Sequence, residues 1–394
     1  MSTKLMLLFI FIFAALTGCS NYKELNELGI VVGAGIDYDP KKDVYEVVHQ
    51  VINPSENNVQ GSGSGATAVV SFKSSGKTLV EAARNSSKKF NRLPIYSHIA
   101  LLIIGEQLAK KETLNFLFDV FERDGKVRVN IPVLIARNTD VQQLMDTLPS
   151  LGKIPMSTIV QTVDISSQLL GENGETKVFE VIQSLASEGR EPAISGISIG
   201  NDKKNEITQA NLETMDKAYV YLNGVGMFKK GKLVGWMDGK KTKSIQIIDN
   251  TLQETSLRIH CNEKKYNSIL INRSHSRVKV DMQNNQAVIS VRTHAIGTLD
   301  EMLCNKDISN DKVIKEFEYK AKQELQQEIR SGILAAQQKG SDIFGFGDVL
   351  HISHPDKWKK VKQDWNKMFA KAKIDIHVDI GIESTGMRIE PYRY

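Results

Sequence analysis

Cysteine is scarce in this chain of 394 residues, which contains only Cys19, Cys261 and Cys304. Small secreted domains that depend on a disulfide framework use more cysteines at closer spacing, so the chain does not belong to that class. Cys261 and Cys304 can either form a bridge or remain two separate thiols. Because two cysteines 43 positions apart give no framework spacing, we favour separate thiols.

Long hydrophobic runs are absent beyond the N-terminal segment. The most apolar later stretch, residues 99–104, has the length of a buried strand. A helix needs roughly 20 apolar residues to cross the hydrocarbon core of a bilayer. The sequence after the first twenty residues therefore predicts no membrane-spanning helix.

A strong excess of one charge sign is also lacking. Lys and Arg number 51 against 46 Asp and Glu, which gives a formal net charge of +5. The basic residues form no long run and are rarely interleaved with aromatic ones, so nucleic-acid binding is not expected. With 25% charged and 41% hydrophobic residues the composition is that of a globular protein, long enough for two or three domains.

The N-terminal segment has the features of a lipoprotein signal peptide. Lys4 precedes an uncharged apolar run at residues 5–16, which is too short to span a bilayer and typical of a signal-peptide core. The run ends in Leu16-Thr17-Gly18-Cys19, the pattern that lipoprotein signal peptidase cleaves before a lipid-modified cysteine. We predict cleavage between Gly18 and Cys19, with diacylglycerol and an N-acyl chain on Cys19. An ordinary signal peptide with a chance cysteine is the alternative.

The first half of the chain alternates predicted strands and helices. The sequence predicts strands at residues 28–36, 44–52, 69–72, 99–104 and 127–136, and helices at 78–90, 114–123, 141–145 and 178–187. Residues 148–170 show no firm period and are left unassigned. The alternation predicts one mixed sheet covered by helices.

The second half has a different pattern. Residues 200–216 are polar and lose the apolar period, which makes them the best domain boundary. Beyond them we expect a hairpin at 218–237, strands of one antiparallel sheet, a helix over 311–339, a helix from Pro355 and an amphipathic strand at 374–382. The predicted fold is therefore α+β with several lobes. Its parts are a signal peptide at 1–18, an N-terminal α+β region at 19–205 that can comprise two lobes, and a C-terminal α+β domain at 206–394.

The residues that carry chemistry in enzymes do not form a convincing set. The Gly-Ser repeat at 61–65 lacks the strand and helix of a nucleophile elbow or a dinucleotide site, and we interpret it as a flexible loop. His351 and His354 are placed in a loop without other ligands at metal-binding spacing. Glu122, Arg123 and Asp124 are interpreted as a solvated helix end with local ion pairs, and a partner contact is the alternative. We therefore predict no catalytic, cofactor or metal residue, and no enzyme. Trp358 and Trp365, seven residues apart, are interpreted as core anchors.

Several segments in a fixed order give the chain a resemblance to the Ger(x)C family, the lipoprotein C subunits of nutrient germinant receptors. They follow the lipobox cysteine along nearly the whole mature chain. These segments are residues 24–31, 35–37, 96–98, 103–106, 118–124, 226–229, 232–236 and 346–348, followed by Trp358 and Trp365.

The resemblance implies a lobed α+β protein on the outer face of the inner spore membrane. It also implies two integral-membrane partner subunits, a response to nutrients and a role in triggering germination. A solute-binding lipoprotein of a transporter is the alternative, and a lipid-anchored hydrolase of the cell wall is a third hypothesis. Calorimetric binding of amino acids or sugars by the mature domain would favour the second hypothesis, and turnover in a hydrolase screen would favour the third.

Overall fold

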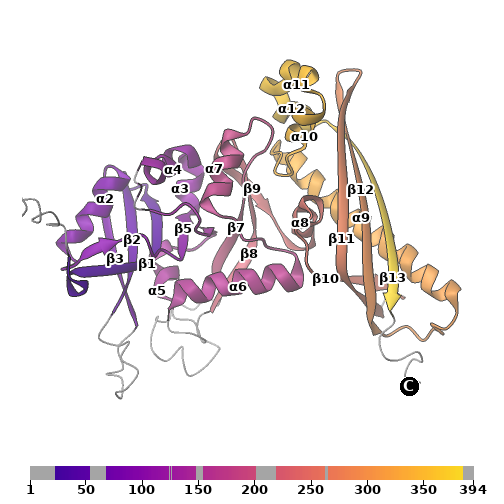
Figure 1. The fold of residues 1–394 in the computed structure, drawn as a ribbon, viewed down its shortest axis with the longest axis horizontal. Helices are drawn as coiled ribbons and strands as arrows, with labels where there is room; N and C mark the ends of the chain where they lie inside the picture. The colour runs from indigo at the N-terminus through magenta and orange to yellow at the C-terminus, as the bar shows by residue number, and fades with distance from the viewer. Residues whose placement is uncertain are drawn as a thin grey trace, which may run out of the picture.

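The computed structural model describes residues 23–53, 68–123, 125, 127–147, 154–200, 219–261 and 265–384. Two sheets organise these residues, and helices pack against both (Figure 1). The α+β fold predicted from the sequence is confirmed. The predicted division at 205/206 and the Gly-Ser loop at 61–65 lie outside the described residues, as does Cys19.

The first sheet is mixed, as expected. Its strand order is β3-β2-β1-β5-β6-β7-β8-β9, with β4 beside β1, and β1, β5, β6 and β7 run parallel to one another. The strands are β1 (Leu28–Asp39), β2 (Val44–Ile52), β3 (Val69–Gly76), β4 (Leu93–Ile95), β5 (Leu101–Gly105), β6 (Val133–Ala136), β7 (Ala193–Gly200), β8 (Tyr219–Lys229) and β9 (Lys232–Met237). The predicted strand at 127–136 thus forms only in its last four residues.

Helices cover both faces of this sheet (Figure 1). The central strands β5 and β6 are buried along their whole length, and such strands are continuously apolar because neither face meets water. Two separate apolar cores lie on the two faces. One involves α2 (Leu79–Asn85), α3 (Glu106–Lys111), α4 (Leu114–Arg123) and α7 (Val178–Ala186), and the other α5 (Val141–Asp146) and α6 (Pro155–Leu170).

Helix α6 occupies most of the stretch left unassigned in the sequence. Pro155 starts it, Gly171 ends it in the left-handed conformation with φ 66°, and it buries Met156, Ile159 and Val163. The apolar period is therefore present. It is diluted by hydroxyl residues such as Thr162, whose Oγ1 donates to the carbonyl of Thr158 at 3.0 Å. Ser and Thr have moderate helix propensity, so tertiary packing decides this helix.

Helix α2 is shorter than predicted. Thr78 caps it, because its hydroxyl accepts the backbone N–H of Glu81 at 3.1 Å. The regular helix stops at Asn85, and a 3-10 turn, η3 (Ser86–Lys88), replaces the predicted continuation to residue 90. The hydroxyl of Ser86 donates to the carbonyl of Ala83 at 2.7 Å, a local bond that competes with the helix ladder.

The hairpin β8–β9 extends the first sheet instead of opening the second. Strand β8 pairs antiparallel with β7, and β9 pairs with β8. The predicted hairpin forms, and the structure adds that it continues the first sheet. The reason is that β8 covers the free edge of β7, a pairing between distant segments that local sequence does not specify.

The second sheet has the order β10-β11-β12-β13. Its strands are β10 (Thr255–His260), β11 (Tyr266–Gln283), β12 (Gln286–Met302) and β13 (Lys373–Ser384). Buried and outward residues alternate along β12, which confirms the one-sided burial expected from the sequence. The sheet is antiparallel except that β13 runs parallel to β12, after a long crossover through helices.

Helix α9 (Asp311–Lys339) confirms the longest predicted helix at both ends. Asn310 caps its start by accepting the N–H of Lys312 at 3.0 Å, and Gly340 ends it with φ 57°. At 1.5 Å per residue its 29 residues span about 43 Å, and the helix runs along the second sheet (Figure 1). Shorter helices complete the fold, namely α8 (Lys243–Asp249), α10 (Phe346–Ser353), α11 (Pro355–Val361) and α12 (Trp365–Phe369).

Cys261 and Cys304 form a disulfide, so the expectation of two separate thiols was wrong. The cysteines follow β10 and β12, and these strands point the same way because each is antiparallel to β11. Both cysteines therefore emerge at one end of the sheet, with Cα atoms 5.7 Å apart, which suits a bridge.

Candidate functional site

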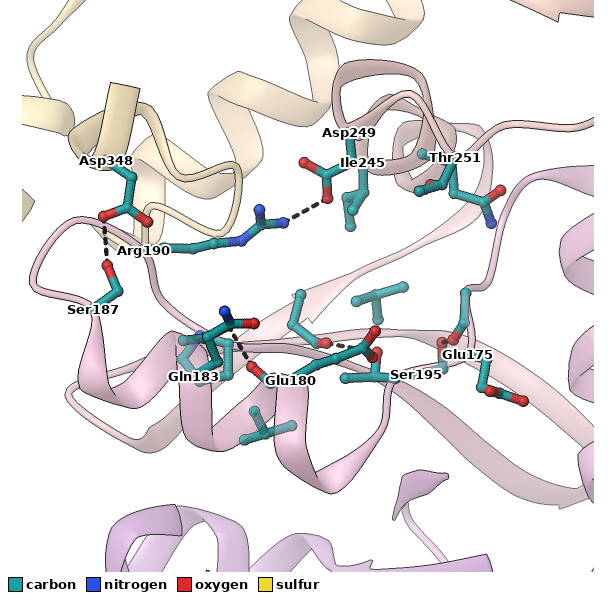
Figure 2. Close-up of a pocket in the computed structure, with 18 of the residues that line it drawn as sticks. Glu175, Glu180, Gln183, Ser187, Arg190, Ser195, Ile245, Asp249, Thr251 and Asp348 are labelled. Carbon is teal, nitrogen blue, oxygen red and sulfur yellow. Dashed lines mark hydrogen bonds and ion pairs between the residues drawn. The ribbon is translucent and has the colours of Figure 1, made fainter. Parts of the chain in front are cut away.

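A cleft of about 730 Å³ lies beside the junction of the two sheets (Figure 2). One wall comes from α7, β7 and the residues before α7. The other wall comes from α8 and the first turns of α10. Segments far apart in sequence thus meet here, as is common for ligand sites between domains.

Polar contacts join the two walls at one end of the cleft. The Arg190 guanidinium contacts the Asp249 carboxylate at 2.5 Å, and the Ser187 hydroxyl donates to the Asp348 carboxylate (Figure 2). The backbone N–H of Glu191 donates to the carbonyl of Asp342 at 2.8 Å. The loop between α7 and β7 is therefore fixed to both α8 and α10.

Two glycines allow this loop to approach α10. A Cβ added to Gly347 would lie 2.7 Å from the Gly189 Cα and 2.6 Å from the Trp365 indole nitrogen. Carbon atoms do not approach so closely, so any side chain at Gly347 would push the two backbones apart. Residues 346–348, one of the segments carrying the family resemblance, thus form the junction of the two halves.

A buried carboxylate orients the start of α10. Asp342 is fully buried and accepts the N–H of Gly347 at 2.8 Å, the N–H of Phe346 at 3.2 Å and the Trp365 indole N–H at 2.8 Å. Burial disfavours the charged form, and this outweighs the three donors, so the pKa of Asp342 rises to about 6.

This pKa predicts a pH dependence of stability. Between pH 4 and pH 6 the folded protein keeps the Asp342 proton while the unfolded chain loses it, because the unfolded pKa is near 3.8. The free energy of unfolding should therefore fall by roughly 3 kcal/mol from this group as pH rises across that window, and then level off. Urea unfolding at pH 4, 5, 6 and 7 measures the slope.

The Asp342→Asn variant is the control for that slope. Its side chain does not titrate, so the part of the slope due to Asp342 should disappear. Asp37 also has a pKa raised to about 6 by burial, so a second part should remain in the variant. An unchanged slope in Asp342→Asn would contradict the assignment. The variant should also be less stable at pH 7, because one amide oxygen replaces two carboxylate oxygens facing three donors.

Carboxylates dominate the cleft lining. They are contributed by Glu172, Glu175, Glu180, Asp249 and Asp348. Arg190 supplies the fixed positive charge among the lining residues, and desolvation raises the pKa of Asp249 against the effect of this arginine. The cleft therefore suits hydrogen bonding and the binding of a cationic group.

Two serine hydroxyls at the cleft, those of Ser187 and Ser195, donate hydrogen bonds to acceptors other than a histidine base. Ser187 donates to Asp348, and Ser195 donates to the carbonyl of Gly174 at 2.9 Å. Activation of a serine needs a base such as histidine within hydrogen-bond distance. The imidazole of His351 instead stacks on Trp358, with ring centroids 5.7 Å apart.

Of the two histidines singled out in the sequence, His351 lies on α10 and not in a loop, whereas His354 stands in the connection between α10 and α11. His354 faces Asp281, with Nε2 3.8 Å from the carboxylate. In the described part of the chain no group of three or more His, Cys, Asp or Glu residues could hold a metal ion.

The remaining residues predicted from the sequence are structural. Trp358 and Trp365 are buried and pack edge to face with centroids 5.5 Å apart, which confirms them as core anchors. Arg123 pairs with Asp119 one turn earlier at 2.8 Å, on an exposed helix end as interpreted. Among the described helices, none is long and apolar enough to cross a membrane.

Sequence reasoning missed the junction residues Ser187, Arg190 and Asp249. Each stands alone in its segment, so no spacing marks it. The only indication of the junction in the sequence was the segment 346–348, which is one of the segments that carry the family resemblance.

Comparisons with known proteins agree with this architecture. Residues 21–199 match the family model described as "Spore germination protein N-terminal domain", and residues 223–386 match "Spore germination B3/ GerAC like, C-terminal". Together the two matches cover both sheets. The fold and its sequence therefore define a two-part spore germination protein.

Individual relatives lead to the same class. Spore germination protein KC of Bacillus subtilis (strain 168) is 29% identical over 388 residues, covering 96% of this chain and 95% of that protein. Spore germination protein B3 of the same organism is 26% identical over 382 residues, with 95% of each chain covered. The crystal structure of the GerBC protein has the same fold, with a TM-score of 0.55, 20% identity, and 89% of this chain and 97% of that chain covered. The chain belongs to the Ger(x)C family of spore germination proteins.

Proposed function

We propose that this chain is a lipid-anchored, non-enzymatic subunit of a membrane receptor complex that responds to nutrients and triggers spore germination. The observation that carries the proposal is family membership along both halves of the chain, together with the Leu16-Thr17-Gly18-Cys19 pattern. The proposed anchor consists of diacylglycerol and an N-acyl chain on Cys19, with cleavage after Gly18. Two acyl chains hold a soluble body stably on a membrane.

In this proposal the body lies on the extracytoplasmic face of the inner spore membrane, beside two integral-membrane subunits. The carboxylate-rich lining of the cleft supports a binding role, and the hydroxyls of Ser187 and Ser195 donate to a carboxylate and a backbone carbonyl rather than to a histidine. A receptor subunit of this kind acts by contacting its partner subunits and catalyses no reaction. The proposal does not require that the cleft itself holds the nutrient.

A pull-down from spore inner membrane tests the proposal. A tag follows Tyr394, and the complex is solubilised in mild detergent. We expect co-purification of two multi-spanning proteins in stoichiometric amounts. Recovery of a transporter permease with an ATPase would instead support a solute-binding lipoprotein, and recovery of the chain alone would contradict membership of a complex.

A further inference from the structure

We propose that the surface built by α2, η3 and β4 lies directly against the anionic membrane to which the chain is tethered. We call it the α2–β4 cationic surface, and it consists of Arg84, Lys88, Lys89, Arg92 and Leu93. The inference rests on the lipid anchor of the proposed function. It adds an orientation, because an anchor alone leaves the body free to rotate on its tether.

The tether enters the fold beside this surface. Three residues lie between Cys19 and Lys23, the first described residue, and four residue steps of extended chain reach at most about 14 Å. Strand β1 begins at Leu28, which pairs with Leu93 of β4. The ring of Phe90, within the same segment, covers Gly29. The start of the fold and the cationic surface are therefore adjacent.

The cations of this surface are not neutralised by neighbours. Within the described part of the chain, none of Arg84, Lys88, Lys89 and Arg92 forms an ion pair, whereas the nearby Lys73 contacts Glu46 at 2.6 Å. Lys89 donates to the backbone carbonyl of Lys73 at 2.8 Å, which leaves its charge in place. From residue 79 to 98 the sequence contains one carboxylate, Glu81, which accepts the backbone N–H of Lys77.

Anionic headgroups are the complement of such a surface. A Lys or Arg near an anionic leaflet strengthens attraction by on the order of fivefold, and the effect fades within a Debye length of about 8–10 Å. The short tether keeps the start of the fold, which adjoins this surface, close to the leaflet. Apolar residues accompany the charges, because Leu93 is 54% exposed and Val80, one turn before Arg84, is 44% exposed. Such residues can enter the headgroup region.

The place of the α2–β4 cationic surface in the molecule determines where the second sheet lies relative to the membrane. Helix α2 lies at one end of the long axis, and the second sheet lies at the other end (Figure 1). Docking through the α2–β4 cationic surface therefore holds strands β10–β13 away from the bilayer.

Vesicle binding of the unlipidated chain tests the proposal. The mature chain with Cys19→Ser is sedimented with vesicles of phosphatidylcholine containing 30% phosphatidylglycerol, and with phosphatidylcholine alone. We expect binding to the anionic vesicles only, and its loss at 0.5 M salt. Changing Arg84, Lys88, Lys89 and Arg92 to Gln should weaken binding by about 100-fold or more. Leu93→Ser should weaken it by several-fold.

A second set of cations provides a matched control. Arg277, Lys279, Arg292 and Lys373 are exposed on the outward face of the second sheet and form no ion pair among the described residues. Replacing all four of these residues with Gln removes the same net charge. The affinity of this control variant should stay within about threefold of that of the starting chain. Circular dichroism verifies that both variants are folded.

Three results would overturn the proposal. These are no binding to anionic vesicles, no loss in the Arg84/Lys88/Lys89/Arg92 variant, or an equal loss in the control variant. The lipid anchor is tested separately by mass spectrometry of the native N terminus. If the native N terminus carries no lipid while the Cys19→Ser chain binds anionic vesicles through this surface, the anchor alone is contradicted.

Discussion

Replacing Cys19 with Ala is expected to move the protein from the membrane fraction to the soluble fraction. Each buried methylene of an acyl chain contributes about 0.8 kcal/mol, so losing all the proposed acyl chains removes the dominant attachment. The variant is expressed behind a signal peptide with an ordinary cleavage site, because signal removal at Gly18 depends on the lipid. Membranes are washed in 0.5 M salt, which removes chains held by charge alone. Fractionation and mass spectrometry of the N-terminal peptide measure the result.

The other two cysteines supply the control for that experiment. The double variant Cys261→Ser with Cys304→Ser loses the disulfide but keeps Cys19. It should remain in the washed membrane fraction and carry the same acylated N-terminal peptide. An unmodified N terminus in the starting protein, or membrane retention of the Cys19→Ala chain after the salt wash, would contradict the lipid anchor.

Replacing Gly347 with Val is expected to lower the free energy of unfolding by about 4 kcal/mol. Overpacking a rigid contact typically costs 1–3 kcal/mol, and here the contacted atoms are the Gly189 backbone and the Trp365 ring. Separating the backbones should also weaken the hydrogen bonds to Asp342 and between Ser187 and Asp348, at about 1 kcal/mol each. Equilibrium unfolding in urea measures the loss.

Gly381 offers the matched control for the Gly347 variant. It lies on β13, and a Cβ added there meets no atom within 4 Å. Gly381→Val should be neutral or slightly stabilising, because valine favours strands. If Gly347→Val unfolds at the same urea concentration as Gly381→Val, the junction is not as tightly packed as the structure indicates.

The elements predicted well from the sequence are those whose own pattern determines them. Helix α9 carries an apolar stripe between an Asn cap and a Gly stop, and β13 alternates apolar and polar residues along its length. For these elements local propensity and tertiary packing favour the same structure. Helix α6 shows the opposite case, because its Ser and Thr residues obscure a real apolar stripe.

The features of the fold that could not be predicted depend on contacts between segments far apart in the sequence. The pairing of β8 with β7 and the disulfide between Cys261 and Cys304 are fixed by strand order, which no short stretch of sequence encodes. The cleft has the same origin, since Arg190 and Asp249 belong to different segments and only the folded chain brings them together. Gly347 belongs to a segment that carries the family resemblance. Its glycine is required because the backbone of Gly189 lies against it on the opposite wall.

The parallel pairing of β12 with β13 sets an order on how this fold is completed as the chain is made. Synthesis runs from the N terminus, so β12 is formed some 70 residues before the strand that covers its edge. Until then β12 presents a long unpaired edge, a template for association between chains. A chain truncated before Lys373 would keep that edge permanently. The last strand thus protects newly made copies from associating through this edge.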